Sequence, residues 1–96
     1  MPKRPVHPGE VLREDVVRPL GISANQLAHA LRVPANRISE ILAERRSLSA
    51  DTALRLSRYL GTSAEFWLKL QQGYDLETAR LRSGKRIAHE VLRRGR

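Results

Sequence analysis

The polar side chains best suited to recognising another molecule lie close together, at residues 36 to 40. Arginine can form two hydrogen bonds with guanine and asparagine two with adenine, both in the major groove of double-stranded DNA. The sequence places Asn36 beside Arg37, and Ser39 and Glu40 follow within one helical turn. We therefore interpret these four residues as candidate base contacts, with a solvated helix face as the alternative.

A second polar set flanks the first on both sides. Ser23, Asn25 and Gln26 stand where a helix is expected to begin, and backbone N–H groups with short side chains can hold a phosphate there. Arg45 and Arg46 follow the expected reading helix, and their charge has no evident local purpose. All five are candidate phosphate contacts, although capping alone would explain Ser23 and Gln26.

Nothing comparable points to catalysis or to a metal. The three histidines, His7, His29 and His89, are far apart in sequence, and there is no cysteine. Glu14 and Asp15 are adjacent on an expected helix, so their carboxylates point apart. No glycine-rich phosphate loop or nucleophile elbow is present. We expect a protein with no catalytic residues, metal or cofactor.

Charge and composition favour a polyanionic partner. Eighteen basic residues against ten acidic ones give a net charge of +8, and 41% of the 96 residues are apolar but only 4% aromatic. The basic surplus fits DNA binding, or simply a soluble basic surface. Seven basic residues lie in 73–96; they could extend the DNA contact, meet an acidic partner or flank a dimerising helix. No apolar run is long enough to span a bilayer, so we expect a cytoplasmic protein without a membrane partner.

The candidate residues require helices to position them. A first helix is expected from Pro8 until Pro19 ends it. Ser23 and Gln26 form a capping box that begins the next helix, and Ile22 can pack on it as a hydrophobic staple. A further helix begins near Pro34, where a proline suits the first turn.

The remaining helices follow from similar patterns. One is expected from Ser49 to Gly61, and another from a capping box formed by Thr62 and Glu65. Gly73 is a possible break, as is the pair at 83 and 84. No period-two pattern predicts a strand. We predict an all-α single domain over 1–96 with five to six helices, in which 8–72 form the core and 73–96 a C-terminal helical extension.

The spacing between Leu27 and Ile41 is typical of a helix-turn-helix motif. Two short helices that cross steeply need a small residue at their contact, which Ala28 supplies, and an apolar residue in the turn, which Val33 supplies. The run from Ile22 to Gln71, ISANQLAHALRVPANRISEILAERRSLSADTALRLSRYLGTSAEFWLKLQ, resembles the lambda-repressor-like (XRE-family) helix-turn-helix domain. With HPGEVLRED before it, the chain resembles HigA-type antitoxins over residues 5–82. It departs from the usual pattern at Arg32, where a left-handed backbone would cost about 1 kcal/mol.

This resemblance implies a cytoplasmic homodimer that binds a palindromic operator and represses its own toxin–antitoxin operon. It also implies a toxin partner, an mRNA endonuclease of the HigB or RelE kind. The alternative is a free-standing or phage-type repressor without a toxin, and a small basic gene next to this one would distinguish the two.

Aromatic and aliphatic residues after position 65 give the expected dimer interface. It comprises Phe66, Trp67, Leu70, Tyr74 and Leu81. Adjacent aromatics can also stack on the bases of single strands, but on a capped helix they more often lie in a core or a dimer contact.

Overall fold

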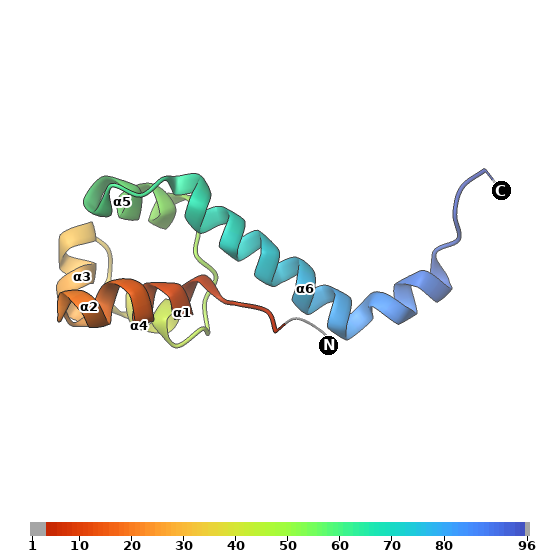
Figure 1. Ribbon diagram of the computed structural model, residues 1–96, viewed down its shortest axis with the longest axis horizontal. Coiled ribbons are helices and arrows are strands. Elements are labelled where there is room, and N and C mark those ends of the chain that lie inside the picture. Colours follow the sequence, from red (N-terminus) through yellow and green to blue (C-terminus); the bar gives the residue numbers. More distant parts are fainter. Residues whose placement is uncertain (1–3, 96) are drawn as a thin grey trace.

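Helices separated by short turns make up the described part of the protein, residues 4–95 of a computed structural model. In chain order they are α1 (Pro8–Leu12), the π-helical turn η1 (Arg13–Val17), α2 (Arg18–Leu20), α3 (Ala24–Leu31), α4 (Ala35–Leu42), α5 (Ala50–Leu60) and α6 (Ala64–Glu90). The short helices gather at one end, and α6 extends away from them as a long arm (Figure 1). The predicted all-α fold is confirmed.

The first helical segment continues past Pro19, so the predicted end at this proline is wrong. A proline ring in a regular α-helix collides with the carbonyl four residues before it. Here that residue, Asp15, lies in the wide turn η1, and the Arg18 N–H bonds to Arg13 O, five residues back. The segment ends instead at Gly21, which adopts a left-handed conformation with φ of 64°.

The core is aliphatic and centres on α3 and α4. Its buried members are Leu12, Leu27, Ala28, Leu31, Ile38, Ile41, Leu48, Ala53, Leu56 and Trp67. Trp67 is only 1% exposed, and its indole N–H donates to Thr62 Oγ1 at 2.9 Å. Because Trp67 is enclosed within one chain, its assignment to a dimer interface was wrong.

Helix α6 begins and continues differently from the prediction. Its N-cap is Ser63, whose Oγ accepts a hydrogen bond from Phe66 N at 3.0 Å, whereas Thr62 serves Trp67. The helix runs through Gly73 and Gly84 without the predicted breaks, because strong helix formers surround each glycine. It therefore crosses the expected boundary at 72 and 73 uninterrupted, and Figure 1 shows it changing direction in its blue, C-terminal part. No helix within residues 4–95 has the length and apolar character needed to cross a membrane.

Candidate nucleic-acid interface

The first motif helix, α3, begins with the predicted capping box. Gln26 N donates to Ser23 Oγ at 3.0 Å, and Ser23 N donates to Gln26 Oε1 at 2.8 Å. Both oxygens are therefore occupied inside the protein, but the Ser23 hydroxyl hydrogen and the Gln26 NH2 group remain as donors. Asn25 is exposed beside them, so the three candidate phosphate contacts share one helix start.

The turn between α3 and α4 has the predicted left-handed arginine. Arg32 has φ of 60° and ψ of 44°, and its N–H bonds to His29 O at 3.1 Å. Val33 N then bonds to Ala28 O at 3.0 Å, which satisfies the last carbonyls of α3. This tight turn sets the angle at which α4 leaves α3.

Helix α4 has one face in the core and an opposite face that is largely exposed. Ile38 and Ile41 are fully buried, whereas Asn36 and Ser39 are exposed. Ser39 Oγ donates to Asn36 O at 3.2 Å, so the serine is oriented by its own helix. Asn36 has no part in the core and stays exposed to solvent.

Three of the charged candidates on and after α4 are paired within the protein. Arg46 Nε donates to Glu40 Oε1 at 2.8 Å, so the assumption that Arg46 has no local role was wrong. Arg37 lies 3.6 Å from Asp51 Oδ1 through its Nη1 atom, and its side chain is 31% exposed. Arg45, in the loop that follows the helix, is exposed. The guanidinium groups of Arg37 and Arg46 are thus already oriented by carboxylates of this chain.

A polar pocket of about 450 Å³ brings several of these groups together. Two of its lining residues, Arg37 and Arg46, were predicted site residues, and two further arginines, Arg32 and Arg55, were not. The pocket therefore gathers four guanidinium groups from α4, α5 and the loops between the helices.

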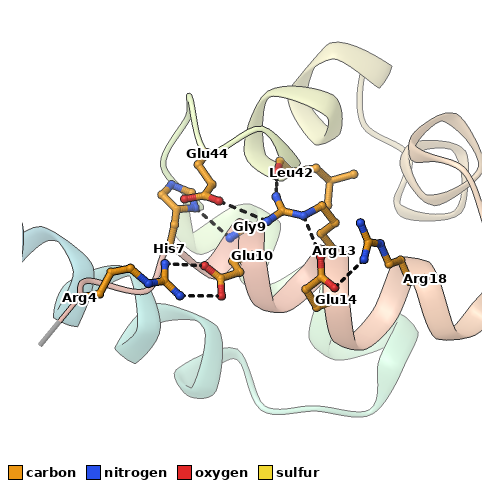
Figure 2. Close-up of polar contacts among 9 residues, drawn as sticks. All are labelled: Arg4, His7, Gly9, Glu10, Arg13, Glu14, Arg18, Leu42 and Glu44. Atoms are coloured by element: carbon orange, nitrogen blue, oxygen red, sulfur yellow. Dashed lines mark hydrogen bonds and ion pairs between the residues drawn. The ribbon is translucent and has the colours of Figure 1, made fainter.

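Two arginines that are not among the predicted site residues fix the ends of the motif helices. Arg13 donates from Nη1 to Leu42 O at 2.5 Å, at the end of α4, and also pairs with Glu14 and Glu44 (Figure 2). Arg55 donates from Nη1 to Leu31 O at 2.9 Å, at the end of α3. A guanidinium at a helix C-terminus satisfies free carbonyls and opposes the helix dipole. The sequence indicates neither contact, because the two partners lie 29 residues apart in one case and 24 in the other.

His7 joins the N-terminal segment to the rest of the protein. It is buried as the N-cap of α1 and accepts a hydrogen bond at Nδ1 from Gly9 N at 2.8 Å (Figure 2). Its ring meets Tyr74 of α6 edge-on, with centroids 4.8 Å apart. Burial lowers the pKa of His7, and the nearby carboxylates of Glu44 and Asp75 and a hydrogen bond to the Arg46 backbone only partly oppose this.

A buried glutamine anchors the loop that carries Arg45 and Arg46. Gln71 on α6 accepts a hydrogen bond from Leu48 N at 2.7 Å and donates to Asp75 Oδ1 at 2.9 Å. In the sequence, Gln71 is a polar residue among the apolar residues of a helix, and that pattern does not predict this contact. The contact holds the loop after α4 against the start of the long helix.

The remaining candidate dimer residues lie along α6. Phe66 and Leu81 are 43% and 59% exposed, and Leu70 and Tyr74 are half-buried. Phe66 packs edge-on against Trp67 with centroids 5.0 Å apart. Within residues 4–95, no three histidine or acidic side chains are grouped so that they could hold a metal ion.

Known proteins resemble the chain in both sequence and structure. The helix-turn-helix family HTH_3 matches residues 12–67. Virulence-associated protein I of Dichelobacter nodosus is 54% identical over 74 residues, which cover 77% of this chain and 68% of that protein.

Two solved structures are similar over nearly the whole chain. One is an addiction module antidote protein of the HigA family from Coxiella burnetii, with 50% identity, a TM-score of 0.89 and coverage of 95% of this chain and 99% of that chain. The other is the Pseudomonas aeruginosa antitoxin HigA with the higBA promoter, with 47% identity, a TM-score of 0.92 and coverage of 96% and 100%.

Proposed function

The chain belongs to the helix-turn-helix family and, within it, to the HigA group of antitoxins, and from this premise we propose that it represses its own toxin–antitoxin operon. It binds operator DNA through α3 and α4 and neutralises a toxin of the HigB or RelE kind. Membership of this family makes it a binding protein and not an enzyme.

The observation that supports this proposal most strongly is the exposed polar face of α4. Buried Ile38 and Ile41 hold the opposite face down, and Arg13 fixes the end of the helix. In helix-turn-helix proteins this exposed face enters the major groove. The similar HigA structure from Pseudomonas aeruginosa contains promoter DNA.

We assign base reading to the α4 face and phosphate contacts to the two sides of the motif. Asn36 and Arg37 read bases, with Ser39 and Glu40 beside them. Phosphates are held at the start of α3 by Ser23, Asn25 and Gln26, and after α4 by Arg45 and Arg46. Arg46 Nε and Glu40 Oε1 are paired at 2.8 Å. Each of these two residues therefore contacts DNA either as part of this pair or after the pair has separated.

The operator is proposed to be palindromic and the protein a cytoplasmic homodimer that folds as one domain over residues 1–96. Two α4 helices about 34 Å apart would then enter successive major grooves on one side of the duplex. The dimer contact is assigned to α6 through Phe66, Leu70, Tyr74 and Leu81.

Binding titrations with two arginine variants test this function. The probes are a fluorescent duplex from the region upstream of the gene and a scrambled duplex of the same composition. Arg37→Ala should weaken operator binding by about 1 to 3 kcal/mol and relax specificity at one base pair. Arg45→Ala should weaken both duplexes alike and reduce the salt dependence by about one phosphate contact.

Two outcomes would contradict the proposal. Equal, salt-sensitive binding of the wild-type protein to both duplexes would leave only a basic protein without an operator. Wild-type behaviour of both variants would show that α4 is not the reading helix. The toxin partnership is tested separately, by co-purification with the product of a neighbouring small basic gene.

A further inference from the structure

Asp51 occupies an unusual place for a carboxylate in a DNA-binding surface. Among the described residues that line the 450 Å³ pocket it is the one acidic side chain, and four arginines line the same pocket. It is 60% exposed and lies 3.6 Å from Arg37 of α4, so it is close to DNA if α4 reads the major groove. A carboxylate there repels phosphates, which calls for an explanation.

Arg55 holds the Asp51 carboxylate in place. Arg55 Nε donates to Asp51 Oδ1 at 2.7 Å, and the two residues are one helical turn apart on α5. Arg55 is itself anchored, because its Nη1 atom donates to Leu31 O at 2.9 Å. Asp51 is therefore a fixed negative charge beside the end of α3.

The same oxygen also attracts the proposed reading arginine. Arg37 Nη1 lies 3.6 Å from Asp51 Oδ1, which is too long for a good hydrogen bond but close enough for an ion pair. The Arg37 side chain is drawn along the protein surface and is 31% exposed. A pair of this kind at the surface is weak, so a better partner can displace it.

We propose that Asp51 is an affinity-setting residue that competes with the operator for Arg37. On non-operator DNA, Arg37 stays with Asp51, and the carboxylate weakens contact with the backbone. On the operator, a guanine offers two hydrogen bonds to the guanidinium and displaces the carboxylate. Because only operator binding breaks the Arg37–Asp51 pair, Asp51 lowers operator affinity more than non-specific affinity. This inference rests on the proposed function, since it presupposes that α4 reads DNA.

The test is Asp51→Asn, which keeps the size of the side chain and removes its charge. Affinity for the operator should rise up to about fivefold, as expected for the loss of one surface ion pair that operator binding must break, while scrambled-duplex affinity rises less. The ratio of operator affinity to scrambled-duplex affinity should rise accordingly. Asp15→Asn makes the same change at an exposed position outside the pocket and should leave the ratio unchanged.

A double-variant cycle separates competition for Arg37 from simple charge repulsion. If Asp51 acts through Arg37, Asp51→Asn should raise operator affinity less in an Arg37→Ala background than in the wild type. Equal effects in both backgrounds would overturn the proposal, as would an unchanged affinity ratio in Asp51→Asn. Circular dichroism of each variant establishes that it is folded.

The same titrations distinguish this failure from failure of the proposed function. If wild-type protein prefers its operator and Asp51→Asn prefers it equally, only the role of Asp51 is wrong. If wild-type protein shows no preference, the assignment of α4 as a reading helix is wrong as well.

Discussion

At the scale of single residues, the protonation of His7 affects the stability of the folded protein. Its Nδ1 atom accepts the Gly9 N–H, so the ring must be neutral at this nitrogen. Protonation would place two hydrogens against each other in a buried site. The folded protein therefore binds a proton here less readily than the unfolded chain, in line with the lowered pKa caused mainly by burial.

We expect the free energy of unfolding to fall as pH decreases from 7 to 5. Because the folded pKa of His7 lies below its ordinary value of 6.5, its contribution is complete above about pH 6.5 and is lost as pH falls through the folded pKa. One such group gives a slope of at most about 1.4 kcal/mol per pH unit. His7→Asn keeps an acceptor for the Gly9 N–H but does not titrate, so it should flatten this slope in urea denaturation.

His29→Asn is the matched control for this measurement, since His29 is exposed on α3. His7→Asn will lower overall stability through lost contact with Tyr74, so the slope and not the absolute value is compared. A slope in His7→Asn as steep as in wild type and control would rule out His7 as its source.

Local side-chain roles were predicted well where they depend on neighbours in sequence. The capping box of Ser23 and Gln26 and the left-handed Arg32 formed as expected. Arg13 and Gln71 were missed because each bonds to a carbonyl or N–H more than twenty residues away. No spacing rule encodes such a contact, because it depends on how the helices pack.

At the scale of elements, the start signals were more reliable than the stop signals. Helices begin after His7, Ser23 and Ser49, where a side chain accepts a backbone N–H in each case. The stop predicted at Pro19 failed because η1 changes the hydrogen-bond register before it. A helix N-cap depends on a few adjacent atoms. A residue that would end an isolated helix can instead be carried along when the helix around it is stable.

The approach of α1 to α4 depends on one glycine. A Cβ atom on Gly9 would lie 1.8 Å from Ile41 O, and backbone cannot move aside as a flexible side chain can. Gly9→Ala should therefore lower the free energy of unfolding by about 1 to 3 kcal/mol, although alanine favours helices. Displacement of α4 should also weaken operator binding. Urea denaturation and the operator titration measure the two effects.

Gly73→Ala is the control for this substitution, because a Cβ there meets nothing within 4 Å. It should raise stability by about 0.5 to 1 kcal/mol, the usual gain of alanine over glycine inside a helix. If both variants raise or both lower the free energy of unfolding, the close approach of Gly9 to Ile41 O does not explain the effect at Gly9.

At the scale of the whole molecule, α6 makes the protein long. The described part measures 54 × 25 × 21 Å, and α6 leaves the other helices as an extended arm (Figure 1). Exposed apolar side chains lie along its outer half. One of them, Leu81, lies on the same side of α6 as Phe66, Leu70 and Tyr74. Apolar groups in such a row gain stability when a second surface covers them. The proposed homodimer supplies that surface and also links two reading helices.

The dimer can be tested with a charge placed on this helix. Leu81→Glu should shift the protein toward monomer in sedimentation velocity at micromolar concentration, because a carboxylate in an apolar interface loses its hydration. Operator affinity should fall with it, since separate half-site binding loses the advantage of linkage. Ala79→Glu adds the same group two residues earlier, on nearly the opposite side of the helix, and should remain dimeric. A wild-type monomer under these conditions, or a Leu81→Glu dimer that binds as wild type does, would remove α6 from the interface.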